Sequence, residues 1–146
     1  MKKTIVIGSD HGGFALKQAL IEALAAWGHP VEDQGPDCAD SCDYPVFAAR
    51  VAERIKADKD ALGVLICGTG QGMTMAANRL GVRAALCTNE FLARMAREHN
   101  DARVLCLGER VTGQGLALAI LKTFLETGFG GGRHQRRIDL MDATSE

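Results

Sequence analysis

Short apolar runs alternate along this chain with longer segments in which apolar residues recur every three or four positions. The runs are mostly aliphatic and β-branched, which is typical of buried strands. We predict strands over Thr4–Ile7, Val31–Asp33, Val64–Ile66, Val82–Cys87 and Val104–Leu107. Because most of these runs do not alternate with polar residues, they indicate a parallel sheet that is covered on both faces.

The longer segments have the period of amphipathic helices, with apolar residues three and four positions apart. We predict helices over about Leu16–Trp27, Pro45–Ile55, Gly72–Arg79, Asn89–His99 and Leu116–Leu125. Strands that alternate with helices predict an α/β fold, a single doubly wound, Rossmann-like domain over residues 1–146. Its five-stranded parallel sheet would have helices on both faces.

Residues 130–146 form a tail after the last of these helices. Three glycines, 130–132, precede the basic stretch Arg133–Arg137 and a short polar end. On a helix, Arg133 and Arg137 would share one face, where paired guanidinium groups can hold one phosphate. We expect the glycines to be flexible and to let the tail reach a neighbouring subunit, although a solvated basic tail is the simpler alternative.

Composition narrows the classes of function. With 47% hydrophobic and 24% charged residues and a formal charge of −1, the chain has no global field that would attract nucleic acid or a membrane surface. No apolar stretch approaches the roughly 20 residues that a membrane helix needs. The N-terminal residues do not resemble a secretory signal, and the odd count of five cysteines suggests no disulfide framework. We therefore expect a cytoplasmic protein without nucleic-acid or membrane partners.

The strongest candidate for chemistry is a glycine turn that follows the third predicted strand. That strand ends at Cys67, and Gly68, Thr69, Gly70, Gln71 and Gly72 follow before a predicted helix. Glycines let backbone N–H groups approach a ligand, and a helix N-terminus favours negative charge. The same potential favours the thiolate form of a cysteine. Cys67 is therefore a candidate base beside an oxyanion cradle, although a buried structural cysteine is the alternative.

Other polar side chains should lie at the same edge of the sheet. Asp10 and His11 follow the first strand, and Arg110 follows the fifth. Because the carboxyl ends of parallel strands meet at one edge, we expect these residues to lie near Cys67 and Thr69. The spacing of Cys38 and Cys42 does not suggest a metal site, and Cys87 and Cys106 are best explained as buried hydrophobic residues. His99 suits either the end of its helix or proton transfer.

Together these motifs resemble the ribose-5-phosphate isomerase B family, which also includes galactose-6-phosphate isomerase subunits. The resemblance covers nearly the whole chain. It rests on Gly8–Gly13 (GSDHGG), Asp43–Pro45 (DYP), Cys67–Gly70 (CGTG) with Ala76–Asn78 (AAN), His99–Asp101 (HND), and Gly131–Gln135 (GGRHQ) with Arg137.

The resemblance implies interconversion of aldose and ketose phosphates through a cis-enediol, without metal or other cofactor. Cys67 would be the base, Thr69 would assist at the oxygens, and His99 would open the sugar ring with Asp10. The phosphate would be held by His11, Arg110, Arg133 and Arg137. The backbone amides of the turn from Gly68 to Thr74 would stabilise the enediolate, and the further substrate-binding positions would be Tyr44, Gly68, Gly70, Gly72, Met73, Thr74 and Asn100. A branch of the family that lacks the cysteine has Glu where this chain has Met73.

The resemblance also implies a site between two subunits, in a homodimer or dimer of dimers. His99, Asn100 and the tail arginines would then reach across to a partner. Ribose 5-phosphate is the expected substrate, and allose, galactose or tetrose phosphates remain alternatives.

Three other functions fit parts of the sequence. In a nucleotide-binding module, Glu90 would lie 20 residues beyond Gly70, where a ribose-binding acid is expected, but the glycines follow G-x-G-x-G rather than G-x-G-x-x-G. A cysteine phosphatase would need an arginine at position 73, which is methionine. A non-catalytic sugar-phosphate sensor is the third.

Overall fold

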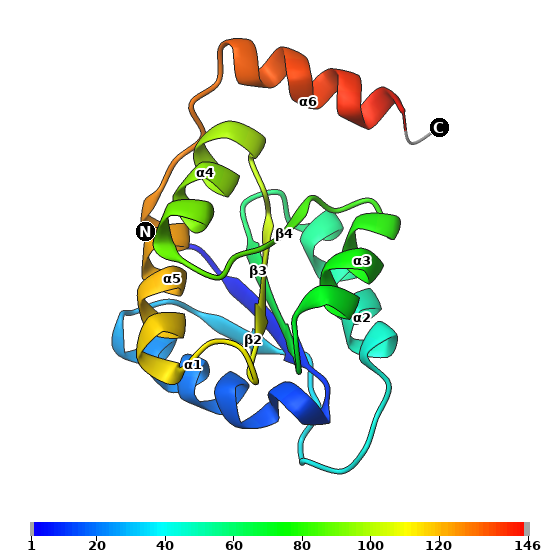
Figure 1. The fold of residues 1–146 in the computed structure, drawn as a ribbon, viewed down its shortest axis with the longest axis vertical. Coiled ribbons are helices and arrows are strands. Elements are labelled where there is room, and N and C mark those ends of the chain that lie inside the picture. Colours follow the sequence, from blue (N-terminus) through cyan, green and yellow to red (C-terminus); the bar gives the residue numbers. More distant parts are fainter. Residues whose placement is uncertain (1, 145–146) are drawn as a thin grey trace.

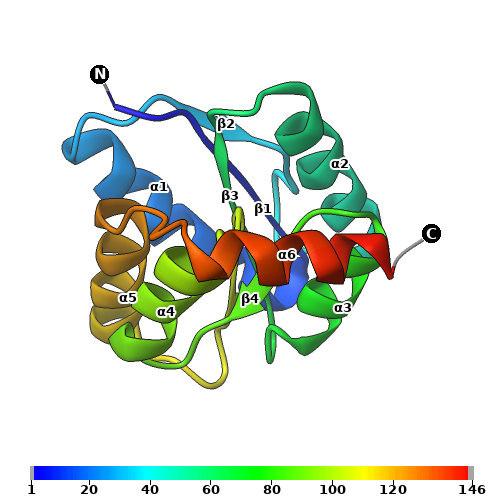
Figure 2. The same ribbon diagram turned by 90° about the horizontal axis from the view of Figure 1, so that it is seen from above.

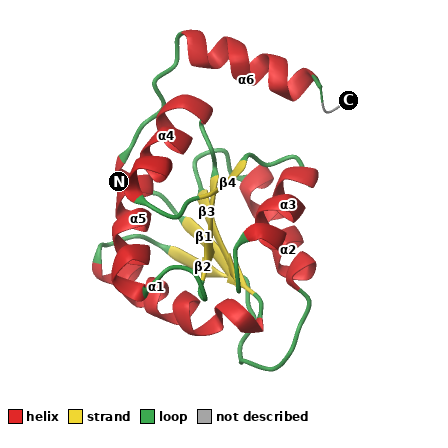
Figure 3. Ribbon diagram, viewed as in Figure 1, coloured by secondary structure: helices red, strands yellow, loops and turns green. Residues whose placement is uncertain are grey.

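A five-stranded, all-parallel sheet forms the centre of the computed structural model, which describes residues 2–144 (Figures 1 and 3). The strand order is β2-β1-β3-β5-β4. The strands are β1 (Ile5–Ser9), β2 (Val31–Asp33), β3 (Leu62–Cys67), β4 (Ala84–Leu86) and β5 (Val104–Gly108). The predicted fold class and the five predicted strands are confirmed.

Helices cover both faces of the sheet. They are α1 (Phe14–Ala26), α2 (Tyr44–Ala57), α3 (Gln71–Arg79), α4 (Glu90–Asn100), α5 (Gln114–Glu126) and α6 (Arg133–Ala143), with a 3₁₀ turn η1 at His11–Gly13. In one apolar cluster α1, α4 and α5 pack on the sheet, and in the other α2 and α3 pack on its opposite face (Figure 1). None of the helices within residues 2–144 is long and apolar enough to cross a membrane.

Successive side chains along the central strands point to opposite faces of the sheet and so contribute to both apolar clusters. In β1, Ile5 and Ile7 belong to the cluster under α1, α4 and α5, whereas Val6 belongs to the cluster under α2 and α3. All three side chains are fully buried. Since successive side chains of a strand point to opposite faces, a continuous apolar run serves two cores at once.

The register of the central strands brings their carboxyl ends level. Ser9 at the end of β1 pairs with Ile66, and Cys67 at the end of β3 pairs with Gly108 at the end of β5. The segments that follow these three strands therefore begin at the same edge of the sheet, as the sequence predicted.

The C-terminal tail differs from its prediction. Arg133 and Arg137 do lie on a helix, α6, but this helix continues to Ala143 through residues that were expected to be a short polar end. Ile138 is 3% exposed, and α6 packs on α4 and extends across one end of the molecule (Figure 2). Gly131 and Gly132 have φ angles of 64° and 56°, a conformation that glycine adopts at little cost, so these residues form a defined bend.

Candidate active site

Cys67 lies at the carboxyl end of β3, with its side chain nearly buried at 6% exposure. The backbone N–H of Gly70 donates a hydrogen bond to the Cys67 Sγ over 3.1 Å. A donor directed at the sulfur stabilises negative charge on it. The turn thus places the thiol at the start of α3, at the border of the core cluster beneath α2 and α3, with one backbone N–H directed at the sulfur.

The turn after Cys67 depends on glycine at two places. Gly70 has a φ of 81°, and a Cβ there would lie 2.5 Å from Leu86 Cδ1. A Cβ on Gly108 would lie 2.5 Å from the carbonyl oxygen of Thr69, so the turn lies directly against the end of β5. These close approaches fix the backbone that carries the candidate cradle.

Helix α3 begins within this turn. Gly70 is its N-cap residue and offers no side chain to cap the helix. The N–H groups of a first helical turn lack intrahelical partners, and together with the helix dipole they attract an anion. The Thr69 hydroxyl accepts the N–H of Gln71 over 3.3 Å, and the Thr74 hydroxyl donates to the Gly70 carbonyl over 2.7 Å.

Asp10 and His11 lie on the neighbouring segment after β1. Asp10 is 8% exposed, and its Oδ1 accepts the N–H of Gly13 over 3.2 Å. A Cβ on Gly12 would lie 3.3 Å both from this oxygen and from the Gly68 nitrogen, so η1 packs closely on the glycine turn. The His11 Nδ1 lies 3.2 Å from the backbone oxygen of Cys42, which ties this ring to the loop before α2.

Arg110 and Tyr44 border the glycine turn. The Arg110 side chain lies over Gly68, where a Cβ would be 3.5 Å from the Arg110 Nε. The backbone N–H of Arg110 donates to the Gly68 carbonyl over 2.9 Å. The Tyr44 ring lies beside Gly72, where a Cβ would be 2.7 Å from it. The structure therefore brings the residues predicted after β1, β3 and β5 together around Cys67.

The side chains of Met73 and Thr74 do not simply line the site. The Met73 side chain is fully buried in the core cluster beneath α2 and α3. The helix turns the side chain at position 73 toward the sheet, so any contact of Met73 with substrate would be made by its backbone. Backbone contact is what the resemblance implies for this turn, so the prediction at Met73 is compatible with the burial of its side chain. Thr74 is half-buried and holds the turn through its bond to Gly70.

The second group of predicted residues lies at the opposite edge of the sheet. His99 and Asn100 end α4, just before β5 begins at Val104, whereas Cys67 pairs with Gly108 at the other end of β5. Five strand residues at about 3.3 Å each separate the two edges by roughly 16 Å. Arg133 and Arg137 lie on α6, which packs on α4 (Figure 1). Within one chain, these residues do not converge on Cys67.

His99 stacks on His134, which was not among the predicted site residues. The ring centroids are 4.2 Å apart and the rings are inclined by 16°. Partial desolvation, together with the positive charges of His99, Arg133 and Arg137, lowers the pKa of His134. The sequence showed that His134 lies beside the arginines. Its stacking on His99, however, depends on how α6 packs on α4, which no local sequence pattern predicts.

Arg97 fixes the end of α4 that presents His99 and Asn100. Its side chain is nearly buried and its Nη1 donates to Asp101 Oδ1 over 3.0 Å and to the Ala102 carbonyl over 2.6 Å.

The glycine segment is tied to the same helix, because the Gly130 N–H donates to the Glu98 carbonyl over 2.9 Å. The second group is therefore held rigidly on its own edge.

The other buried cysteines have no comparable surroundings. Burial raises the pKa of Cys87 to about 11 and, most of all through desolvation, the pKa of Cys106 to about 12. Both remain thiols at neutral pH, as expected for the buried hydrophobic residues that they were predicted to be. Within residues 2–144, no group of three or more His, Cys, Asp or Glu side chains is arranged to hold a metal ion.

Comparison with known proteins assigns this arrangement to a family. The family model described as Ribose/Galactose Isomerase matches residues 5–141. The chain belongs to this family. The predicted resemblance is confirmed, and the matched residues include both groups of site residues.

Relatives of the family span the chain almost completely. Ribose-5-phosphate isomerase B of Escherichia coli is 39% identical over 145 residues, which is 99% of this chain and 97% of that protein. Ribose-5-phosphate isomerase B of Mycolicibacterium paratuberculosis is 42% identical over 140 residues, which is 94% of this chain and 88% of that protein. The solved structure of Clostridium thermocellum ribose-5-phosphate isomerase B superposes with a TM-score of 0.95, at 48% identity, over 97% of this chain and 96% of that one.

Proposed function

We propose that this member of the ribose/galactose isomerase family interconverts ribose 5-phosphate and ribulose 5-phosphate, with Cys67 as the catalytic base. The substrate follows from the relatives named above, which are ribose-5-phosphate isomerases B. The observation that carries the role of Cys67 is its sulfur at the mouth of α3, within 3.1 Å of the Gly70 N–H.

The reaction requires a base and a stabiliser of the developing oxyanion. The Cys67 thiolate removes the proton from C2 of the open-chain aldose, and the C–H electrons form the double bond of a cis-enediolate as the C1 oxygen becomes negative. The turn from Gly68 to Thr74 supplies N–H groups for that charge, and the Thr69 hydroxyl assists at the oxygens. A proton then moves between the two oxygens, and the Cys67 thiol returns its proton to C1 to give the ketose.

Ring opening and phosphate binding fall to the remaining residues. His99 acts as acid and base at the ring oxygen with help from Asp10, and Arg133, Arg137, His11 and Arg110 hold the phosphate. A phosphate distant from the reacting carbons supplies binding energy that orients them. Paired arginines on one helix suit the geometry of such an anion.

A complete site requires a second subunit in this proposal. His99, Asn100, Arg133 and Arg137 lie at the far edge of the sheet from Cys67, so they complete the site of a partner in a homodimer or a dimer of dimers. Tyr44, Met75 and Leu80 are 39%, 65% and 36% exposed on α2, on α3 and just after α3. Apolar surface of this kind, which runs along α3 from the glycine turn to Leu80, supports a subunit contact there.

The redox state of the cysteines indicates the cellular compartment of the protein. All five, each within the described residues, are free thiols. A reducing compartment keeps exposed thiols such as Cys38 in this state, and we place the protein in the cytoplasm.

A panel assay tests the substrate. Conversion of pentose, hexose and tetrose phosphates is followed with the purified protein, and ribose 5-phosphate is expected to be the preferred aldose. Preference for allose, galactose or a tetrose phosphate would replace the substrate and keep the reaction. Cys67→Ala is expected to lose turnover and still bind sugar phosphate. Binding without turnover by the natural chain would instead indicate a sensor.

A further inference from the structure

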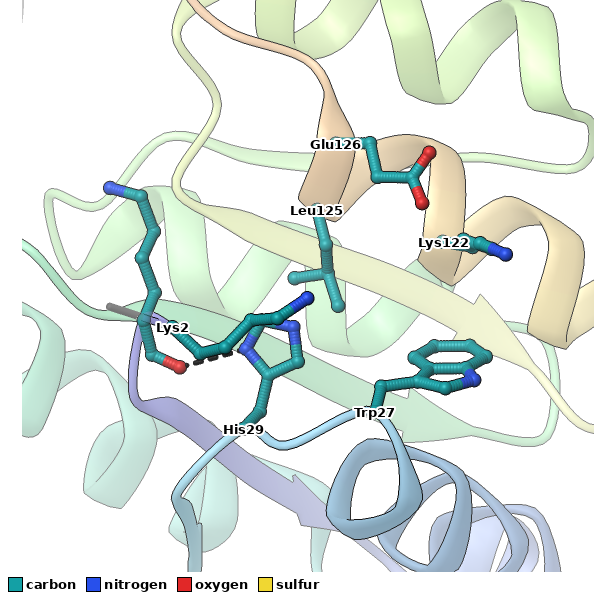
Figure 4. A pocket seen from close by; sticks show the side chains of 7 residues that line it. Lys2, Trp27, His29, Lys122, Leu125 and Glu126 are labelled. Carbon is teal, nitrogen blue, oxygen red and sulfur yellow. Dashed lines mark hydrogen bonds between the residues drawn. The ribbon is translucent and has the colours of Figure 1, made fainter.

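A groove of about 440 Å³ lies at the end of the sheet opposite Cys67 (Figure 4). It is formed where the chain enters β1, where α1 ends, and by the last turn of α5. None of its lining residues belongs to the predicted active site. Its volume is in the range of about 300–1,000 Å³ that is usual for small-molecule sites.

The apolar wall of the groove offers a flat aromatic surface. Trp27 is the C-cap residue of α1, and Leu125 lies on α5; both are half-buried and pack against the core. Figure 4 shows the indole and the Leu125 side chain lining the same cavity. An indole that is fixed from behind by a core favours stacking with a planar ring.

The rim of the groove carries two ammonium groups without an anionic partner. Among residues 2–144, no ion pair involves Lys2 or Lys122, and both line the groove. Lys3 directs its ammonium elsewhere, to the Asp60 carbonyl at 3.4 Å. Glu126 is the one acid of the lining, so the groove has an excess of positive charge.

His29 adds a directional group. Its Nδ1 lies 2.9 Å from the Lys3 carbonyl, and because a carbonyl only accepts hydrogen bonds, this nitrogen carries the proton. In Figure 4 the dashed line marks this bond, and the second ring nitrogen lies on the side of the cavity. A neutral His29 therefore offers Nε2 as an acceptor for an N–H group of a ligand.

We propose that this groove binds a nucleotide. The base would stack on Trp27 and donate an N–H to His29, while the phosphates would lie between Lys2 and Lys122. The Glu126 carboxylate would accept hydrogen bonds from the sugar hydroxyls. A sugar phosphate has no planar ring for the indole, so this site takes a different class of ligand from the active site and does not depend on the proposed reaction.

Intrinsic fluorescence tests this proposal directly, because Trp27 is the only tryptophan of the chain. ADP is titrated into the full-length protein, and saturable quenching is expected. Lys2→Ala and Lys122→Ala should each weaken ADP binding roughly tenfold, since each removes a charged hydrogen-bond donor. Lys56→Ala, an exposed lysine on α2, is the matched control and should leave the affinity unchanged.

Adenosine and inorganic phosphate separate the two halves of the ligand. Each alone is expected to bind more weakly than ADP. The proposal is overturned if ADP gives no saturable quenching at millimolar concentration, or if phosphate alone matches ADP. Equal affinity in the Lys2 and Lys122 variants, or an equal loss in Lys56→Ala, would overturn it as well. Isomerase activity does not enter this measurement, so its outcome is independent of the proposed function.

Discussion

Five cysteines occupy very different surroundings in this molecule, and surroundings rather than residue type single out one of them. Cys67 receives a backbone N–H at the mouth of α3, whereas burial raises the pKa of Cys87 and is the largest cause of the raised pKa of Cys106. Cys38 is exposed in a loop. At the residue scale, the glycine turn distinguishes Cys67 from the others.

Alkylation should reflect these environments. At neutral pH, iodoacetamide is expected to label the exposed Cys38 readily and to leave Cys87 and Cys106 unlabelled until the protein unfolds, because their raised pKa values keep them protonated and burial blocks access. Mass spectrometry of peptides from native and denatured samples measures the labelling. Native labelling of Cys106 at the rate of Cys38 would contradict the burial described.

Replacing Gly70 by alanine should damage the glycine turn. The new Cβ would be forced on a residue with φ of 81°, 2.5 Å from Leu86 Cδ1 and 2.9 Å from the Leu107 carbonyl carbon. Strain and overpacking should together lower the free energy of unfolding by about 2–4 kcal/mol, with a loss of turnover. Urea denaturation measures the first and the isomerase assay the second.

Gly115→Ala is the matched control for that substitution. Gly115 lies in α5, and a Cβ there meets nothing within 4 Å. Alanine should therefore raise stability by about 0.5–1 kcal/mol through its helix propensity. Equal destabilisation by both substitutions would show that position 70 has no special conformational demand.

The local sequence predicted that residues adjacent in the chain group at one site, but it did not predict the directions of their side chains. Cys67 and the glycines are contiguous, so their grouping needed no knowledge of packing. Met73 was named among the substrate-binding positions, and the sequence did not predict that the helix turns its side chain toward the sheet, where it is buried. His134 was missed because its stacking on His99 joins α4 to α6.

Helix α6 shows at the element scale how tertiary contact overrides weak local signals. Few apolar residues mark positions 133–143, and the sequence predicted no helix that would continue to Ala143. Ile138 is nevertheless buried, and Arg83 approaches Asp142 over 3.3 Å from the β4 side. Such contacts stabilise a helix more than its propensity does.

Docking of α6 should weaken in acid. The pKa of His134 is lowered in the folded protein, so the undocked segment binds a proton more readily, and docking is favoured above the ordinary pKa of 6.5 and lost as the pH falls through the lowered value. Hydrogen exchange of α6 amides, corrected for intrinsic rates, should show less protection at pH 5 than at pH 8.

His134→Asn tests the origin of that effect. This variant should remove most of the pH dependence, because no titrating ring then faces His99, whereas His29→Asn should leave it intact. Protection of α6 that stays constant between pH 5 and pH 8 in the natural chain would contradict the role of His134.

The whole molecule presents the two groups of predicted site residues on opposite edges of one sheet. The apolar runs predicted the parallel sheet and its level strand ends, because both follow from local pattern and strand direction. The strand order β2-β1-β3-β5-β4 was not predictable from the runs, which do not specify neighbours. The expectation that His99 faces a partner rests on the resemblance alone, and for the tail arginines it rests also on the glycines that precede them.

Complementation between two inactive variants tests the shared site. Cys67→Ala and Arg137→Ala are each expected to lose most activity. If subunits exchange at random, half of the dimers are hybrids and each hybrid keeps one intact site, so the mixture should recover roughly a quarter of the natural activity. An active monomer by sedimentation, or exchange without recovery, would contradict a site shared between subunits.

In the proposed mechanism, Cys67 moves the proton between C1 and C2. Proton NMR of ribose 5-phosphate in D₂O with Cys67→Ala shows whether it does, because both ketose formation and deuterium entry at C1 or C2 are visible. We expect both to fall by about 10³-fold or more relative to the natural chain, while the sugar phosphate still binds. Isomerisation or deuterium entry at an undiminished rate would contradict the claim.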